Sequence, residues 1–275
     1  MKTSIIIPAN NEEAWMGYCL DALFKSKRVE DAEVIVVANG CTDRTADVAR
    51  TYEVLAEELG WGLKILDLDR GDKLHALNMG EHAAEGDILI YLDADVRVTD
   101  KLIFQITRVL DKEEAAWASG QLQMAAASGV SRAYARFWMK TPFMANSIPG
   151  SGLFAVNRAG RARWDKFPEI IADDMFVRLH FKRRERIAVP SSYVWPVAEG
   201  WGNLIKVRRR QNRGVAQLEE LYPDLFSNED KGGFSKLRIL SYALGDPFGF
   251  IAYAGVALIV RLTKDQTADE WKRGR

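Results

Sequence analysis

The chain has 275 residues, of which 48% are hydrophobic and 28% are charged, and its formal net charge is +0. This composition is that of a folded globular protein and excludes long disordered regions. Since no net positive charge is present to attract a polyanion, we expect no nucleic-acid partner.

The cysteine content and the first residues indicate a cytoplasmic protein. The chain has two cysteines, Cys19 and Cys41, which are too few for a disulfide framework or a zinc site. Met-Lys-Thr leads directly into a strand-like segment, without the apolar stretch and cleavage site of a signal peptide. We therefore expect a cytoplasmic location, extending to the inner face of the membrane if the C-terminal segment contacts lipid.

Strand and helix patterns alternate along the first hundred residues. Apolar, β-branched runs predict strands at 4–10, 32–39, 62–69 and 87–95. Helical spacing and capping residues predict helices at 12–27, 43–59 and 72–84. Such alternation is typical of an α/β fold with a Rossmann-like, mostly parallel sheet and helices on both faces. Ligands bind beyond the carboxyl ends of parallel strands, so the polar residues there are candidate site residues.

The second half of the chain is less regular. We expect a strand at 150–158 and helices at 171–184 and around 205–214. Residues 247–260 form an uncharged run of 14 residues, fewer than the roughly 20 that a membrane-spanning helix needs. We favour a buried or interfacial helix over a span there, and we expect a first domain at 1–230 followed by a helical C-terminal extension at 231–275 that makes peripheral membrane contact.

Asp93 and Asp95 stand at the end of the last of the four predicted strands. Two carboxylates at this spacing offer hard oxygen ligands, which suit a Mg²⁺ or Mn²⁺ ion that bridges a diphosphate. A turn cap is the alternative explanation, because aspartate is common after strands.

Six segments between residue 4 and about residue 180 carry a family resemblance. They are IIIPANNEE, VIVVANGCTDRTADVA, GDKLHALNMG, GDILIYLDADV, GSGLFAVNR and IADDMFVRL. In order and spacing they resemble the family 2 glycosyltransferases, which have the GT-A fold. The resemblance implies a metal-dependent, inverting transferase that moves a sugar from a nucleotide-diphosphate donor, with a UDP-sugar expected, to a hydroxyl of a sugar or lipid-linked acceptor. It also implies a role in polysaccharide or glycolipid biosynthesis.

The same resemblance assigns roles to individual residues. Donor binding is implied for Pro8, Ala9, Asn10, Glu12, Asn39, Lys73, Asn78, Asp93, Ala94, Arg210 and Arg213. The metal is assigned to Asp95 and Asp93, and the catalytic base to Asp174, with Asp173 as the alternative. Acceptor and sugar contacts are implied for Gly150, Ser151, Gly152 and Trp201. Structural roles compete with each of these: helix-end charges for the acids and lysine, a tight turn for the glycines, and a core position for the tryptophan.

Two departures from the family pattern affect the predicted chemistry. Asn39 stands where the family usually has an aspartate that receives the uracil imide N–H, which puts the base in question. The arginine cluster at 208–213 lacks the Gln-x-x-Arg-Trp motif of processive members, so we do not expect processive polymerisation.

Two other functions compete with a transferase. A sugar-phosphate nucleotidylyltransferase would need a glycine-rich, basic loop after the first strand, whereas the chain has Pro-Ala-Asn-Asn-Glu-Glu there. A non-catalytic nucleotide-sugar-binding protein is the second alternative, and the two acid pairs argue against it.

Overall fold

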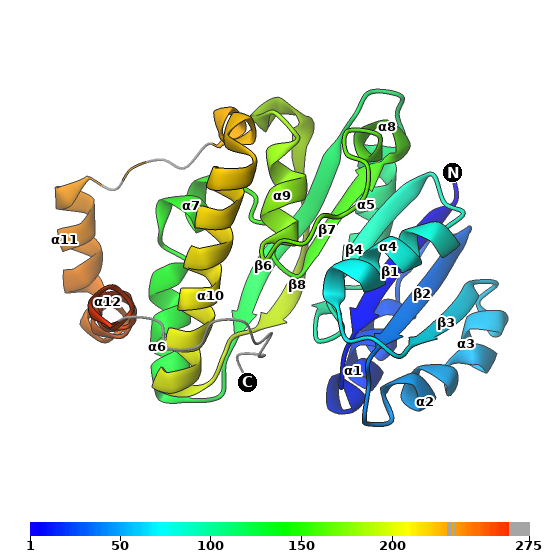
Figure 1. Cartoon of the computed structure of the whole chain (residues 1–275), viewed down its shortest axis with the longest axis horizontal. Helices are drawn as coiled ribbons and strands as arrows, with labels where there is room; N and C mark the ends of the chain where they lie inside the picture. Colours follow the sequence, from blue (N-terminus) through cyan, green and yellow to red (C-terminus); the bar gives the residue numbers. More distant parts are fainter. Residues whose placement is uncertain (230–232, 234, 264–275) are drawn as a thin grey trace. The chain divides into compact units, whose positions relative to one another are not determined.

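The computed structural model describes residues 1–229, 233 and 235–263 (Figure 1). The chain forms two compact units, one from residues 1–123 and 150–195 and the other from residues 124–149 and 196–275. The division differs from the boundary at residue 230 that the sequence suggests. The reason is that α6 (Gly129–Trp138) and α10 (Gly200–Leu221) pack with the C-terminal helices.

The first unit holds the strands and most of the shorter helices. Its strands are β1 Thr3–Ala9, β2 Ala32–Asn39, β3 Gly62–Leu68, β4 Ile88–Leu92, β5 Arg97–Val98, β6 Trp117–Ala125, β7 Leu153–Asn157 and β8 Arg186–Pro196, of which β6 and β8 run on into the second unit. Its helices are α1 Glu13–Leu23, α2 Thr45–Arg50, α3 Glu53–Glu58, α4 Lys73–Ala83, α5 Leu102–Leu110, α8 Arg158–Arg161, α9 Asp173–Leu179 and the 3-10 helix η1 Arg183–Glu185. The second unit consists of α6, α7 Pro142–Asn146, α10, the 3-10 helix η2 Pro223–Asn228, α11 Lys236–Gly245 and α12 Pro247–Leu262.

The strands form one mixed sheet in the order β3-β2-β1-β4-β7-β6-β8-β5. The four strands at one side, β3, β2, β1 and β4, pair in parallel, with Ile5 opposite Val34 and Ile90. Beyond β4 the pairing becomes antiparallel, between β4 and β7, β7 and β6, and β8 and β5. The α/β class is confirmed, and the parallel pairing predicted from the first hundred residues is confined to that half of the sheet.

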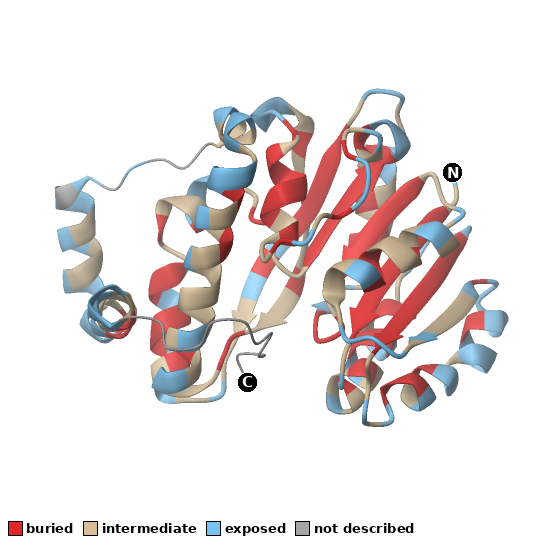
Figure 2. Cartoon of the chain, viewed as in Figure 1, coloured by how far each residue is buried: buried red, intermediate tan, exposed pale blue. Residues whose placement is uncertain are grey.

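The centre of the parallel half is the core of the first unit. Every residue of β1 and β2 is buried, which explains why both read as continuous apolar runs without polar alternation (Figure 2). Helix α4 covers one face through Gly80, where an added Cβ would lie 2.5 Å from Ile6 Cγ2 and 3.2 Å from Val37 Cγ2. The glycine in the Leu-Asn-Met-Gly segment therefore lets this helix approach the sheet closely.

Several predicted elements have different bounds in the structure, among them the strand predicted at 87–95, which ends at Leu92. The helix expected at 43–59 is two helices, α2 and α3, because α2 ends where the Thr51 hydroxyl donates to the Val48 carbonyl oxygen. The helix expected at 171–184 ends at Leu179 and gives way to η1. The strand expected at 150–158 begins only at Leu153, since Gly150 and Gly152 adopt positive φ angles of 71° and 77°.

The apolar run near the C-terminus belongs to α12, in the second unit. This helix packs on α6 with Ala252 and Val256 buried, and the Asp246 side chain caps it by accepting from the Gly249 N–H at 2.9 Å. Because Asp246 separates α11 from α12, residues 239–262 are not one continuous helix. None of the helices within the described ranges has the length and apolar character needed to cross a bilayer.

Candidate functional site

The two acid pairs meet at one lysine. Asp93 follows β4, and Asp173 begins α9, 80 positions later in the chain. Lys73, the first residue of α4, places its Nζ 3.0 Å from Asp93 Oδ1 and 3.0 Å from Asp173 Oδ2. Burial alone would lower the pKa of Lys73, but the two carboxylates outweigh it and raise that pKa above its ordinary value, so the ammonium stays charged. Asp93 and Asp173 therefore lie at one site rather than on separate surfaces.

The glycine turn before β7 connects the same two regions. The Asp93 N–H donates to the Gly152 carbonyl at 2.9 Å, and the Ser151 hydroxyl donates to Asp174 Oδ2 at 3.1 Å. An added Cβ on Gly152 would lie 2.8 Å from Trp195 Cδ1. Glycine is thus required at this position by its positive φ and by the tryptophan beside it.

Asp173 and Asp174 have different surroundings, which separates their roles. Asp173 is buried and pairs with Lys73, whereas Asp174 is half-buried and accepts from the Ser151 hydroxyl and from the Met175 N–H at 2.7 Å. Burial and the neighbouring Asp173 charge raise the pKa of Asp174, against the opposing effect of Lys73. A carboxylate with a raised pKa that is reachable from solvent suits a general base better than one held in an ion pair.

The ends of β1 and β2 form the neighbouring part of the site. Asn39 donates from Nδ2 to the Ala9 carbonyl at 2.7 Å and to the Val37 carbonyl at 3.3 Å, so its amide orientation is fixed. Its Oδ1 is buried and accepts no hydrogen bond from the residues that the structure describes. Asn10 donates to the Gly40 carbonyl at 3.0 Å. The parallel register brings these strand ends beside the end of β4, where Asp93 lies.

Two glycines, Gly40 and Gly71, bring the loops after β2 and β3 into contact beside these strand ends. Gly40 has a φ of 56°, and a Cβ there would lie 2.4 Å from the backbone nitrogen of Gly71. The loops after β2 and β3 therefore touch backbone to backbone. Gly71 was not predicted for the site, although its position between Arg70 and Asp72 just before α4 is typical of a tight connection.

Four predicted donor residues have packing or hydrogen-bond contacts of their own, and donor binding by them stays a prediction. Pro8 and Ala9 lie inside β1 and are buried, not in the loop that follows, so their side chains are packed in the sheet. Ala94 is also buried. Asn78 holds the backbone of Phe167 by two hydrogen bonds. Its Nδ2 donates to the Phe167 carbonyl at 3.0 Å, and the Phe167 N–H donates to Asn78 Oδ1 at 2.8 Å. Its contacts therefore favour the loop-orienting role over direct contact with the nucleotide.

Glu12 is buried immediately before α1, and its backbone N–H donates to the Thr45 hydroxyl at 2.7 Å. This contact ties the loop after β1 to the start of α2. A role of its carboxylate toward the base or ribose stays a prediction.

Three predicted residues belong to the second unit. Arg210 and Arg213 lie half-buried on α10, and their contact with a diphosphate stays a prediction. Trp201 is on the first turn of α10, and its ring lies against Gly255 of α12 within the same unit. Its proposed role as an acceptor platform therefore competes with this packing role.

Two residues of β8 reach the glycine turn and were not predicted for the site. The Tyr193 hydroxyl donates to the Ser151 carbonyl at 2.9 Å, and Trp195 lies against Gly152. Both were missed because β8 carries Pro190 and two serines, which obscure the strand pattern. Their spacing of two places them on one face of a strand, which is the signal that could have identified them.

Asp93, Asp95, Asp173 and Asp174 are called the acid cluster. Its first two carboxylates stay predicted ligands of a divalent cation whose other ligands would be phosphate oxygens and water. Asp93 and Asp95 follow one strand, and Asp95 is buried. No group of three metal-ligating side chains is preassembled among residues 1–229, 233 and 235–263. Mg²⁺ and Mn²⁺ sites of the substrate-assisted kind use one or two carboxylates together with phosphate oxygens and water. The ammonium of Lys73 already stands beside Asp93 as a cation, which shows that this position attracts positive charge.

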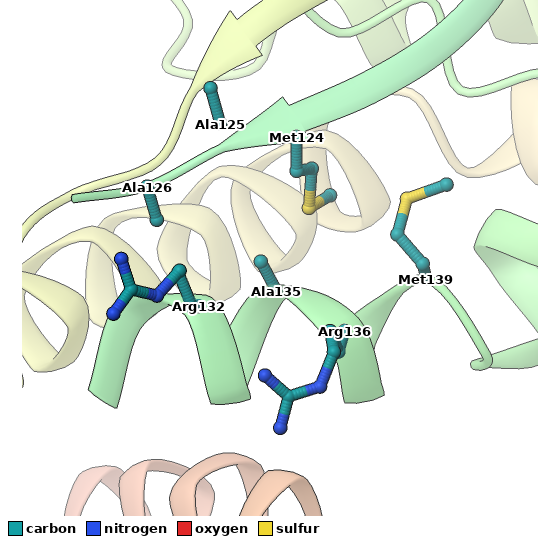
Figure 3. Close-up of a pocket in the computed structure, with 7 residues that line it drawn as sticks. All are labelled: Met124, Ala125, Ala126, Arg132, Ala135, Arg136 and Met139. Carbon is teal, nitrogen blue, oxygen red and sulfur yellow. The ribbon is translucent and has the colours of Figure 1, made fainter. Parts of the chain in front are cut away.

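A separate cavity of about 410 Å³ lies in the second unit, between the end of β6 and α6 (Figure 3). It is lined by Met124, Ala125, Ala126, Arg132, Ala135, Arg136 and Met139. None of these side chains is a carboxylate, so they offer neither a hard oxygen ligand nor a carboxylate base. The predicted catalytic residues all lie outside this cavity.

Comparison with known proteins identifies the family to which the chain belongs. Residues 4–166, more than half of the chain, match the model of glycosyl transferase family 2. A PGL/p-HBAD biosynthesis glycosyltransferase of Mycobacterium bovis is 39% identical over 93 residues, which are 34% of this chain and 34% of that protein. The chain thus spans about a third of the length of the curated relatives it matches.

Solved structures share the fold across nearly the whole chain. A mannosyltransferase of Pyrobaculum calidifontis, in complex with GDP-Man and Mn²⁺, is similar with a TM-score of 0.60 and 19% identity, covering 96% of this chain and 76% of that one. S. aureus TarS in complex with UDP is similar with a TM-score of 0.56 and 16% identity, covering 98% and 94%. The GT-A fold is confirmed by these likenesses, and by its sequence the chain belongs to glycosyl transferase family 2.

Proposed function

We propose that this chain is a metal-dependent, inverting glycosyltransferase that moves a sugar from a nucleoside-diphosphate donor to an acceptor hydroxyl, with Asp174 as the base. The observation that carries the proposal is the arrangement around Lys73, which joins the acid after β4 to the acid that begins α9. One side of this arrangement suits a cation and a pyrophosphate, and the other presents a carboxylate with a raised pKa.

Each acid has one task in this proposal. Asp95 and Asp93 would hold a Mn²⁺ or Mg²⁺ ion, which would supply positive charge to offset that of the departing diphosphate. Lys73 adds a second positive charge beside Asp93. Asp173 holds Lys73 in place, and Asp174 takes the proton from the acceptor hydroxyl as its oxygen attacks the anomeric carbon. Use of Mn²⁺ by the P. calidifontis mannosyltransferase is consistent with the proposed ion.

The orientation of Asn39 supports recognition of a base with an imide or amide N–H. Because Nδ2 is committed to two backbone carbonyls, Oδ1 is the atom left to accept a hydrogen bond. Uracil and guanine present an N–H at the corresponding ring position, whereas adenine and cytosine present a lone pair. Asn39 therefore presents an acceptor, as the family's usual aspartate would. We propose a UDP-sugar donor, with a GDP-sugar as the alternative.

A comparison of Asp174→Asn with wild-type protein tests the proposal. We expect transfer from the donor to fall at least 10²-fold, as for loss of a general base, while donor binding measured by calorimetry with Mn²⁺ is retained. The matched control is Asp87→Asn, which changes a half-buried acid at the opposite end of β4 that pairs with Arg158. Near-normal turnover by Asp174→Asn would remove Asp174 as the base.

Two other functions compete with this proposal, namely a nucleotidylyltransferase and a non-catalytic nucleotide-sugar-binding protein. Family membership argues against the nucleotidylyltransferase, and hydrolysis of the nucleotide sugar by the wild-type protein separates an active transferase from a non-catalytic binder. We propose a sugar or lipid-linked acceptor, while the cytoplasmic location stays a prediction.

A further inference from the structure

Helices α11 and α12 expose large apolar side chains at helical spacing. On α12, Phe248, Ile251, Leu258 and Leu262 are 76%, 60%, 56% and 72% exposed. On α11, Leu237, Leu240 and Leu244 are 80%, 56% and 76% exposed. Figure 2 shows these two helices largely in the colours of exposed and intermediate residues, in contrast to the strands. We call these seven side chains the apolar face.

The opposite side of α12 is fixed to the rest of the second unit. Tyr253 packs on Tyr134 and Phe137 of α6 with ring centroids 5.3 and 5.4 Å apart, and Val256 is fully buried. The two ends of the helix are also anchored. Asp246 pairs with Arg136 at 3.2 Å, and the Arg209 guanidinium donates to the Thr263 hydroxyl after the last turn. The part of the apolar face that lies on α12 therefore belongs to a helix that is held in place.

The charged residues of α11 and α12 are mainly basic. Between residues 235 and 263 the sequence has three basic residues, Lys236, Arg238 and Arg261, and one acid, Asp246. That acid caps α12 and pairs with Arg136 and Lys140, so its charge is already compensated. Arg238 and Arg261 are exposed on the same two helices. An apolar stripe flanked by arginines is complementary to an anionic lipid surface.

Length decides how such a helix meets a bilayer. The 16 residues of α12 rise about 24 Å at roughly 1.5 Å per residue, which is shorter than a hydrocarbon core of about 30 Å. With one side packed on α6, the helix can present only its outer side to lipid. A second copy of the chain is a poorer occupant, because self-association through this face would bring the arginines of two copies together.

From these observations we infer that the apolar face of α11 and α12 is a docking surface for an anionic lipid bilayer, on which α12 lies in the plane of the interface. The inference gives the expected membrane contact a defined set of side chains and a lipid charge. It does not depend on the proposed transferase chemistry, because vesicle binding is measured without donor or acceptor.

Flotation of the full chain with vesicles tests this inference. Vesicles of phosphatidylcholine alone are compared with vesicles that contain phosphatidylglycerol as about a third of the lipid, where each basic residue near the surface adds attraction. We expect wild-type protein to float with the anionic vesicles and to bind them at least tenfold more strongly than the neutral ones. The double variant Ile251→Ser, Leu258→Ser should lose at least tenfold in partitioning to the anionic vesicles, and Arg238→Glu should lose binding by a smaller factor.

The control variant is Val54→Ser, which changes an apolar side chain of α3 that is 67% exposed in the first unit. It should bind vesicles like the wild type, and circular dichroism should show that all variants are folded. Failure of the wild type to float with either vesicle would overturn the inference. So would a dimer in sedimentation velocity that the double variant converts to a monomer without any vesicle binding, because a second copy would then occupy the face.

Discussion

Replacement of Lys73 by methionine tests the central arrangement of the site. The change keeps the length and apolar stem of the side chain and removes the charge that stands 3.0 Å from Asp93 and 3.0 Å from Asp173. Each contact corresponds to a gross Coulomb energy on the order of 5 kcal/mol at an effective dielectric constant of about 20. Desolvation of three charged groups offsets most of this energy, and loss of one partner of a buried cluster typically costs about 3 kcal/mol net.

The expected result is a less stable protein that responds more strongly to metal. A loss of about 3 kcal/mol corresponds to a fall of roughly 6–10 °C in Tm for a chain of this size. Because Asp93 is then no longer paired with an ammonium, added Mn²⁺ should raise the Tm of Lys73→Met by more than it raises that of the wild type. Transfer should nevertheless fall at least tenfold, because a positive charge beside the diphosphate is lost.

The matched control is Lys27→Met, which makes the same chemical change in an exposed pair with Asp100. Exposed pairs contribute about 1 kcal/mol or less, so Tm and the response to Mn²⁺ should stay near the wild-type values. Thermal unfolding followed by circular dichroism, with and without Mn²⁺, measures both quantities. If Lys73→Met and Lys27→Met behaved alike in both conditions, Lys73 would not join the two acid pairs in solution.

Three further predictions follow from the contacts of the first unit. Gly152→Ala should lower the free energy of unfolding by about 2–4 kcal/mol and impair transfer, because the new Cβ meets Trp195. The control is Gly60→Ala, at a similar φ of 71° with open space around it, which should lower the free energy of unfolding in urea by only about 1 kcal/mol. Burial raises the pKa of Glu33, but hydrogen bonds from Ser4, the Glu85 amide and Lys64 lower it overall. The contribution of Glu33 to the free energy of unfolding should therefore be complete at neutral pH and be lost as the pH falls below about 4.5. Urea unfolding of Glu33→Gln should not show this loss. The raised pKa of Asp174 should place the acidic limb of kcat above the range of an ordinary aspartate, and Asp173→Asn should move that limb to lower pH by removing a like charge.

Local patterns were sufficient for the parallel half of the sheet. β1, β2, β3 and β4 occur within one or two residues of their predicted starts, and α4 begins one residue after its predicted start. Strands buried on both faces have no polar alternation, so an unbroken apolar run of this length between turn signals is informative by itself. The positions of Asp93 and Asp95 just after such a strand were readable for the same reason.

The antiparallel half was much less accessible. The nine residues of β6 end in half-buried and exposed positions, and β8 is interrupted by Pro190, so neither shows a clear strand period. Both strands pair with segments distant in sequence, and those partners decide their conformation more than local propensity does. Tyr193 and Trp195 therefore entered the site only through the tertiary structure.

The sequence by itself determined the class of fold, the family and the residue types of the chemistry, because burial period and strand-end polarity are local properties. Only the tertiary structure decided which of those residues meet. Lys73 touches both Asp93 and Asp173 because the starts of α4 and α9 lie beside the end of β4. Asn39 is left with only Oδ1 to accept a hydrogen bond because the Ala9 and Val37 carbonyls occupy its amide nitrogen. Contacts of this kind depend on how distant segments pack, which a linear pattern does not encode.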